Sequence, residues 1–358
     1  MPADLVCPDC ANTYADRWRC ECGHPLRFAE RPLLEGGPPA PEGVDARDGL
    51  WAFESLLPVE RRVSLGEGFT PLVDAPAWGA QFKLEYVFPT GSFKDRGATT
   101  TLSRAAELGV DRVVEDSSGN AGAAIATYAA RAGIDAAVYV PADVKDAKLR
   151  AIRRAGAEPV RVEGSREDVT DACLEAVRAG DGWYASHAWN PAFFAGTATV
   201  AYELACQRGW NAPDAFLAPL GHGTLFLGAY RGFRVLAEAG WIDAVPTMLG
   251  AQAAGYAPIA VARHGPAEGS NDAADGIQIR EPVQADAIRD AIAATDGDAV
   301  AVDADATRRA LDRLHERGFY TEPTCAVAPA ALERYRERGV VDDGDDVVVA
   351  LTGSGLKN

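Results

Sequence analysis

Short apolar runs alternate with amphipathic stretches along most of this chain, and this alternation constrains its fold more than any other feature. The apolar runs predict strands at 82–88, 112–116, 136–141, 159–162, 215–220 and 247–252, and a closing strand and turn at 346–355. The stretches between them predict helices at 98–108, 121–132, 147–155, 166–178, 225–239, 306–317 and 329–337. Strands and helices in this alternation are typical of parallel sheets with helices on both faces, so the predicted class is α/β.

The charge of the chain is strongly acidic and limits its partners. There are 52 Asp and Glu against 35 Lys and Arg, a net charge of −17, and only five of the cations are lysines. Binding nucleic acid requires a basic patch, and we see none. An acidic, lysine-poor surface suits a salt-rich cytoplasm, although a GC-rich genome explains the arginine and alanine excess equally well. No apolar run approaches the length of a membrane helix, and the N-terminus does not read as a secretion signal, so we expect a cytoplasmic protein that inserts into no membrane.

Four of the seven cysteines lie within the first 22 residues. Cys7 and Cys10 are separated by two residues, and Cys20 and Cys22 by one residue. Clustered thiols inside cells bind metal more often than they form disulfides, and four thiolates complete a tetrahedral zinc site. His24 is close enough to replace one ligand. We therefore expect a zinc-ribbon-like cysteine module at 1–30 and a proline-rich linker at 31–48, with a degenerate ribbon that holds no metal as the alternative.

Two loops at predicted strand ends carry polar groups of different kinds. Residues 90–97 read TGSFKDRG, where Lys94 at the mouth of a helix can be desolvated and form a Schiff base. Residues 117–122 read SSGNAG, whose hydroxyls and backbone N–H groups at a helix N-terminus suit a carboxylate. The structural alternatives are a solvated surface charge for Lys94 and simple helix caps for Ser118 and Asn120.

Two further loops add a phosphate cradle and a hydroxyl. Residues 221–224 read GHGT and lead from an apolar run into a helix, where small residues let backbone amides approach an anion. The run fits neither the P-loop nor the dinucleotide pattern. Thr352, in LTGSG at the close of the last predicted strand, offers a hydroxyl to a pyridine nitrogen. A Schiff-base lysine, an amide, a phosphate cradle and a hydroxyl together suit pyridoxal phosphate.

The four loops also carry a family resemblance. In PTGSFKDRG (89–97), SSGNAGAA (117–124), the Gly-rich turn and LTGSGLKN (351–358), the chain resembles the tryptophan-synthase-β superfamily of fold-type-II pyridoxal phosphate enzymes. Within that superfamily it is most similar to threonine synthase, and WAFESLLPV (51–59) and SLGEGFTPLV (64–73) resemble the family's opening. The resemblance implies a larger cofactor-binding α/β domain at 49–96 and 196–358, a smaller one at 97–195, both of three layers with a parallel sheet, and a homodimer.

The resemblance also implies roles for individual residues. Lys94 would carry the cofactor and shuttle protons, Asn120 would bond the cofactor's ring oxygen, and Thr352 would face its ring nitrogen. Ser117 and Ser118 would receive the substrate carboxylate. The cofactor phosphate would be held by Gly221, His222, Gly223, Thr224 and Leu225. Threonine synthases convert O-phosphohomoserine and water to threonine and phosphate, with the lysine as base.

Some positions depart from the threonine synthase pattern and keep other functions open. In the segment NPAFFAGTAT (190–199), Phe194 and Ala198 take the places of an arginine and a lysine, the usual partners of a phosphate. His222 and Phe88 each replace an asparagine. One alternative is a threonine/serine dehydratase or another enzyme that eliminates or replaces a β-substituent. An alternative of another class is a non-catalytic protein that retains the fold for binding.

Overall fold

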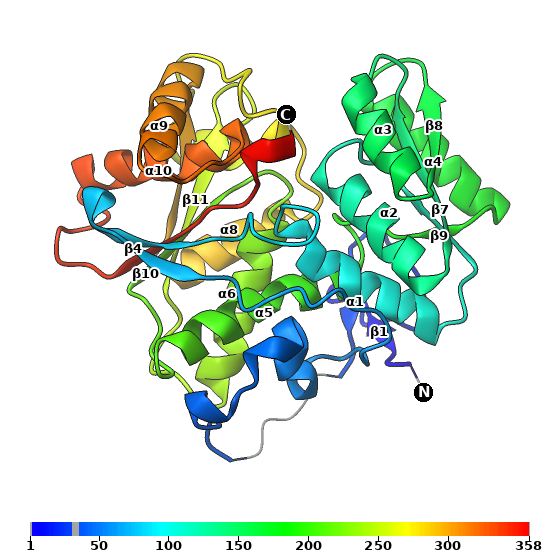
Figure 1. Ribbon diagram of the computed structural model, residues 1–358, viewed down its shortest axis with the longest axis horizontal. Helices are drawn as coiled ribbons and strands as arrows, with labels where there is room; N and C mark the ends of the chain where they lie inside the picture. The colour runs from blue at the N-terminus through cyan, green and yellow to red at the C-terminus, as the bar shows by residue number, and fades with distance from the viewer. Residues whose placement is uncertain (1, 31–35, 358) are drawn as a thin grey trace. The chain divides into compact units, whose positions relative to one another are not determined.

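The computed structural model describes residues 2–30 and 36–357, which form two compact units (Figure 1). Among the described residues, unit 1 comprises 2–30, 46–68 and 94–197, and unit 2 comprises 36–45, 69–93 and 198–357. Residues 31–35, with which the predicted linker begins, lie outside the described residues. The division into a cysteine module, a linker and two α/β domains with the boundaries given above stays a prediction.

Unit 1 is built on a parallel four-stranded sheet in the order β8-β7-β6-β9. Its strands are β6 (Arg112–Glu115), β7 (Asp135–Pro141), β8 (Glu158–Val162) and β9 (Trp183–Tyr184). Its helices are α1 (Lys94–Glu107), α2 (Asn120–Ala132), α3 (Asp146–Arg154), α4 (Arg166–Ala179) and the start of α5 (Pro191–Gln207). The predicted βαβ alternation is confirmed here.

The two faces of this sheet are covered by different helices. Val113 and Val138 pack with apolar residues of α1, α2 and α3, whereas their neighbours Val114 and Ala137 pack with Cys173 of α4. Side chains that are adjacent along a strand point to opposite faces, so both faces of β6 and β7 are buried. Unit 1 therefore has the expected three layers.

Unit 2 contains a six-stranded sheet in the order β12-β11-β10-β13-β5-β4. The strands are β4 (Leu72–Ala75), β5 (Ala80–Lys83), β10 (Ala215–Pro219), β11 (Thr247–Ala253), β12 (Asp298–Val302) and β13 (Val347–Ala350). All neighbours pair in parallel except β4 and β5, which are antiparallel. The five parallel strands carry mostly buried residues, as a sheet covered on both faces requires.

The helices of unit 2 also form two layers. They are α6 (Thr224–Glu238), α7 (Pro258–His264), α8 (Ala285–Ala294), α9 (Ala304–Glu316) and α10 (Pro323–Glu337). Leu217 and Val349 pack against α9 and α10, whereas Phe216 turns to the other face and meets Phe233 of α6, with ring centroids 6.1 Å apart. Short 3-10 helices lie at Pro41–Gly43, Ala46–Leu56, Pro76–Trp78, Asp275–Ile277 and Gly355–Lys357.

The N-terminal module is a three-stranded antiparallel sheet that belongs to unit 1. Its strands are β1 (Leu5–Val6), β2 (Thr13–Tyr14) and β3 (Arg27–Phe28), in the order β2-β1-β3. Trp18 from this module packs edge-on against Tyr184 of β9 and against Trp189. The Arg104 guanidinium of α1 donates to the carbonyls of Ala3 and Ala15. The module is thus attached to unit 1 by both packing and hydrogen bonds.

Several predicted boundaries differ from the structure for local reasons. The strand predicted at 82–88 ends at Lys83, because the next residues form turns in which Val87 N–H donates to Leu84 C=O. The last helix begins at Pro323, six residues before the prediction, and runs through Pro329. Pro323 lies in the first helical turn, where an N–H group has no partner within the helix, so proline loses no hydrogen bond there. Within the described part of the chain, no helix has the length and apolarity to cross a membrane.

Candidate active site

Lys94 begins helix α1 in unit 1. Its side chain is half-buried, and Nζ lies 5.6 Å from the centroid of the Phe193 ring, within the range of a cation–π interaction. The next two residues, Asp95 and Arg96, are completely buried. This lysine therefore lies against an aromatic face at the start of a buried helix, which differs from a solvated surface charge.

The SSGN loop joins β6 to α2 in the same unit. Gly119 is the N-cap of α2, so neither Ser118 nor Asn120 occupies the N-cap position. Ser117 Oγ accepts a hydrogen bond from Gly119 N–H at 3.3 Å. A Cβ on Gly122 would lie 1.8 Å from the carbonyl oxygen of Ser117, so only glycine lets the helix pack this closely on the loop. The polar groups of the loop are thus held at the N-terminus of α2.

The Gly-rich turn lies in unit 2 between β10 and α6. Thr224 and Leu225 are the first two residues of α6, both are buried, and Gly223 is its N-cap in the left-handed conformation with φ +78°. A Cβ on Gly221 would lie 3.2 Å from Cα of Ile277, and one on Gly223 would lie 2.7 Å from a side-chain carbon of Ile288. The turn therefore presents bare backbone at the positive end of a helix dipole.

Residues 91–93 and the LTGSG loop, which both lie in unit 2, are joined by backbone hydrogen bonds. Phe93 N–H donates to Thr352 C=O at 3.1 Å, and Ser354 N–H donates to Gly91 C=O at 2.9 Å. Ser92 and Gly353 form an antiparallel bridge between these bonds. Gly91 has φ +75°, which suits glycine. This pairing positions Thr352, and Lys94 is the residue that follows Phe93 in the chain.

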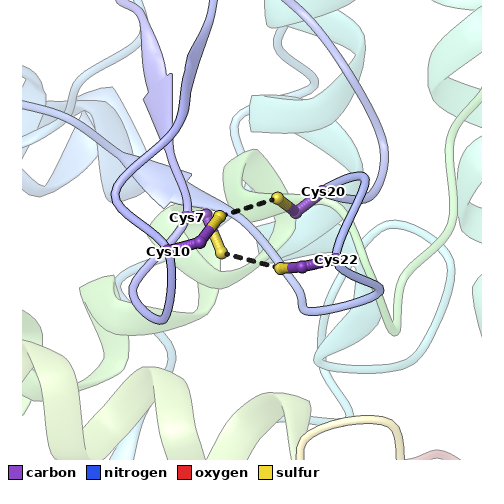
Figure 2. Close-up of side chains that lie close together, drawn as sticks. All are labelled: Cys7, Cys10, Cys20 and Cys22. Atoms are coloured by element: carbon purple, nitrogen blue, oxygen red, sulfur yellow. Dashed lines mark hydrogen bonds between the residues drawn. The ribbon is translucent and has the colours of Figure 1, made fainter.

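The four N-terminal cysteines converge in unit 1 (Figure 2). Their Sγ atoms all lie within 4.8 Å of one another, with 3.5 Å between Cys7 and Cys22 and 3.4 Å between Cys10 and Cys20. A tetrahedral zinc ion with Zn–S bonds of ~2.3 Å separates its sulfurs by about 3.8 Å. His24 Nδ1 lies 3.4 Å from Cys22 Sγ, in a second group with Asp9. The donor set and its spacing fit a zinc ion.

Comparison with models of known families shows which family the chain belongs to. A family model described as "Pyridoxal-phosphate dependent enzyme" matches residues 63–353. The chain belongs to the pyridoxal-phosphate-dependent enzymes.

Curated relatives of this pyridoxal-phosphate-dependent enzyme are threonine synthases. The threonine synthase of Methanocaldococcus jannaschii is 32% identical and is covered over 92% of its length by 98% of this chain. That of Methanosarcina acetivorans is 33% identical, with 86% of this chain and 80% of the relative covered. This enzyme is a threonine-synthase-like lyase, in agreement with the sequence prediction.

Solved structures of the same fold support the architecture. The processed form of threonine deaminase isoform 2 from Solanum lycopersicum matches with a TM-score of 0.70 and 20% identity, over 91% of this chain and 89% of that one. At this identity the likeness shows only the fold. The predicted fold-type-II α/β class is therefore confirmed.

The residues present in each unit fit pyridoxal phosphate. Unit 2 supplies the bare backbone turn at Gly221–Leu225 for a phosphate, and the buried Thr352 for the ring. Unit 1 supplies Lys94 together with the serines and Asn120 of the SSGN loop. Each set matches the chemistry of the group that the family binds.

Segment 190–199 has no cation, and the structure places its aromatic residues in the interior. Phe193 and Phe194 are 0% and 2% exposed, and Ala198 is also buried. A Cβ on Gly97 would lie 2.2 Å from the Phe193 ring, so α1 and α5 meet at very close range. Phe88, the other departure near the lysine motif, is buried as well.

The sequence analysis did not identify two notable residues of unit 1, Glu115 and His187. Glu115 is the last residue of β6, and its Oε1 lies 2.7 Å from His187 Nδ1. Burial raises the pKa of Glu115 well above the usual carboxyl range, and Asp116 adds to the shift. A glutamate that continues the apolar run of a buried strand was the available signal, since such positions rarely hold an unpaired acid.

A second buried network supports the lysine helix. Tyr128 Oη donates to Glu67 Oε2 at 3.1 Å and lies 3.3 Å from Asp95 Oδ2, while Trp51 Nε1 donates to Glu67 Oε1 at 2.9 Å. Burial, followed by the charges of Asp95 and Glu67, raises the pKa of Tyr128, so the phenol keeps its proton. The network ties α2 to the residue that follows Lys94.

Proposed function

We propose that this enzyme converts O-phosphohomoserine and water to threonine and phosphate. The proposal is supported above all by the complete set of cofactor residues, Lys94, Asn120, the Gly221–Leu225 turn and Thr352, in a chain about one-third identical to proteins named threonine synthase.

The chain's own residues would divide the work. When bound, pyridoxal phosphate supplies an electron sink for carbanions. Lys94 Nζ would hold the cofactor and then move protons at the substrate carbons. Ser117, Ser118 and the backbone of the SSGN loop would orient the substrate carboxylate. Asn120 would bond the cofactor's ring oxygen, and the Thr352 hydroxyl would face its ring nitrogen.

Product analysis tests this proposal. The purified holoenzyme is expected to release inorganic phosphate and threonine from O-phosphohomoserine, and Lys94→Ala is expected to release neither and to lose the visible absorbance of lysine-bound cofactor. Release of ammonia and 2-oxobutanoate from threonine, without phosphate release from O-phosphohomoserine, would refute it.

A threonine/serine dehydratase is the second candidate. It is favoured by the buried Phe193, Phe194 and Ala198, in a segment where threonine synthases commonly carry cations. A hydroxyl leaving group needs no such cations, whereas a phosphate dianion does. The same product analysis separates the two reactions.

We further propose that the cysteine module holds structural zinc through Cys7, Cys10, Cys20 and Cys22. Support comes from the convergence of the four thiols on one point (Figure 2). Metal analysis is expected to find one zinc per chain in wild type and none in Cys7→Ser, and a metal-free wild type would favour the degenerate ribbon.

The acidic surface supports a location in a salt-rich cytoplasm, and the fold supports a homodimer. Light scattering in high and low salt is expected to give twice the mass of one chain. A monomer in both buffers would refute the dimer.

A further inference from the structure

Glu115 and His187 form a buried acid–base pair in unit 1 to which no role is yet assigned. Their exposed fractions are 0% and 6%, and Glu115 Oε1 lies 2.7 Å from His187 Nδ1. Glu115 Oε2 is also buried and has no hydrogen-bond partner among the described residues. A buried carboxylate oxygen without a partner is costly, so the pair requires an explanation.

Glu115 Oε1 and His187 Nδ1 can share one proton, and both side chains are buried away from water. Burial raises the pKa of Glu115 and so favours its uncharged form. When Glu115 is a carboxylic acid, its O–H donates to His187 Nδ1, and the ring hydrogen is on Nε2. If the proton passes from Oε1 to Nδ1, Glu115 becomes a carboxylate and His187 an imidazolium. Nε2 carries a hydrogen in both states, so it is a donor throughout.

The pair lies close to the residues of unit 1 that serve the reaction. The His187 ring meets the Phe193 ring edge-on at 6.0 Å, and Lys94 Nζ lies 5.6 Å from the centre of the same Phe193 ring. Ser117 follows Glu115 by two residues at the end of the same strand. The charge of Lys94 opposes the rise in the pKa of Glu115 that burial causes.

The pair also lies near a chain segment that lacks the cations that a substrate phosphate needs. A substrate phosphate needs a cation, and segment 190–199, which starts three residues after His187, contains only uncharged side chains. An imidazolium beside a carboxylate supplies a cation without leaving an isolated buried charge when the site is empty.

We propose that the Glu115–His187 pair binds the phosphate of the substrate, with His187 Nε2 as the donor and with the proton passing from Glu115 to His187 when the dianion arrives. The inference rests on the proposed function. His187 is the residue that touches phosphate, and Glu115 is a positioning residue that holds and delivers the proton.

Inorganic phosphate is the probe, titrated into the holoenzyme by calorimetry. His187→Gln keeps a polar side chain of similar size but loses the positive charge, and it is expected to weaken phosphate binding about 10- to 100-fold, the range of a charge-assisted hydrogen bond. Thermal unfolding and cofactor absorbance check that each variant is folded and loaded.

The pH dependence distinguishes a proton donor from a merely structural neighbour. In wild type the proton comes from within the pair, so phosphate affinity is expected to change less than about twofold between pH ~7.5 and ~8.5. In Glu115→Gln the His187 imidazole must take its proton from solvent, so phosphate affinity is expected to fall about tenfold between pH ~7.5 and ~8.5. The charged or titratable groups that act on Glu115, or on which it acts, are Asp116, Lys94, His187, Arg166, Cys173 and Tyr184.

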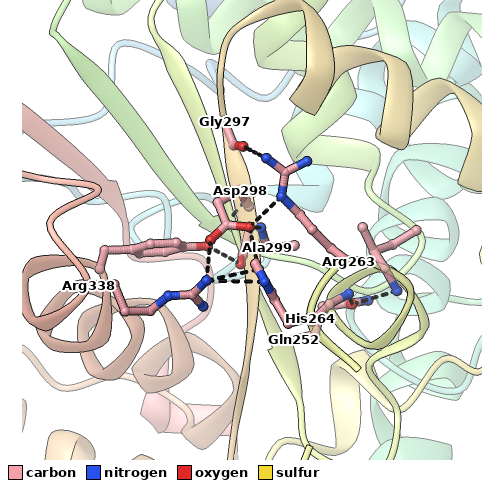
Figure 3. Close-up of polar contacts among 11 residues, drawn as sticks. Gln252, Arg263, His264, Gly297, Asp298, Ala299 and Arg338 are labelled. Carbon is pink, nitrogen blue, oxygen red and sulfur yellow. Dashed lines mark hydrogen bonds and ion pairs between the residues drawn. The ribbon is translucent and has the colours of Figure 1, made fainter. Parts of the chain in front are cut away.

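A matched control pair exists in unit 2 (Figure 3). His264 Nε2 lies 2.6 Å from Asp298 Oδ1, and this carboxylate also pairs with Arg263 and Arg338. His264→Gln therefore removes a histidine from a carboxylate pair of similar length, 2.6 Å against 2.7 Å, while leaving the acid paired. It is expected to leave phosphate affinity and its pH dependence unchanged.

The outcomes separate the inference from the proposed function. Failure of wild type to bind phosphate, or equal affinity in wild type and His187→Gln, would overturn the inference even if the enzyme makes threonine. An effect of His264→Gln as large as that of His187→Gln would overturn it as well. Phosphate binding that depends on His187, in an enzyme that releases no phosphate from O-phosphohomoserine, would support a phosphate site at this pair. It would refute the proposed function, and with it the assignment of that phosphate to the substrate.

Discussion

Because α1 and α5 cross at close range, we expect Gly196→Ala to lower both the activity and the stability of the enzyme strongly. A Cβ at this position would lie 1.9 Å from the carbonyl oxygen of Arg96 and 2.3 Å from Thr100 Oγ1. Side-chain carbons essentially never approach backbone oxygens within 3.0 Å, so the two segments must separate by about 1 Å. The oxygen belongs to backbone and cannot turn away as a side chain does.

The displacement would move Lys94 and the Phe193 ring that lies against it. Lys94 lies on the first turn of α1, and Phe193 lies on the first turn of α5. Overpacking of this kind costs about 1–3 kcal/mol of unfolding free energy, and a misplacement of about 1 Å costs about 100-fold in rate. We therefore expect kcat/KM to fall by about two orders of magnitude and the thermal midpoint to fall by several degrees.

Phosphate release and thermal unfolding, measured on the same preparations, test this reasoning. Gly344→Ala is the matched control, because Gly344 is exposed and an added Cβ there would meet nothing within 4 Å. The reasoning fails if Gly196→Ala stays within twofold of wild type in kcat/KM with an unchanged midpoint, or if the control loses as much as the test variant.

Three further predictions concern buried polar groups. Tyr128→Phe, which removes the donor shared by Glu67 and Asp95, should lower the unfolding free energy by about 1.5–3 kcal/mol in urea titrations, and an unchanged midpoint would contradict it. Asp298→Ala leaves two arginines and a histidine without their shared carboxylate and should cost about 1–3 kcal/mol, less in concentrated salt; equal loss at all salt concentrations would argue against the ion pairs. Burial raises the pKa of Cys325 from 9.0 to about 12, so between these pH values the unfolded thiol ionises before the folded one and stability falls as pH rises. Cys325→Ala should reduce that slope in unfolding curves, and an identical slope would count against the buried thiol.

Most of the local structure was predictable because its signals are local. The helix predicted at 121–132 begins one residue earlier and ends at the same alanine, with Gly133 in the left-handed conformation that closes it. The strand predicted at 112–116 ends one residue earlier, at Glu115. Hydrophobic period and glycine position decide both outcomes within a dozen residues of chain.

Prediction was weaker where tertiary contacts override local preference. Residues 84–88 continue an apolar pattern, yet they turn away after Lys83, whose buried ammonium is bonded to Glu203 and to the carbonyl of Thr70. Helix α5 was not predicted, because its apolar residues are not gathered on one face and its sequence shows no helical period. Its burial between other elements supplies the stability that no amphipathic face provides.

The candidate site divides in the same way. Lys94, the SSGN loop, the Gly-rich turn and Thr352 were readable as motifs, because each needs particular residue types at adjacent positions. Glu115 can be noticed as an acid in an apolar run, but its partner His187 lies 72 positions away and nothing local indicates the pairing. Residue order thus indicates most of the strands, helices and loops and the family to which the chain belongs. Only the folded chain decides which buried charges meet, because burial and pairing depend on neighbours that are distant in sequence.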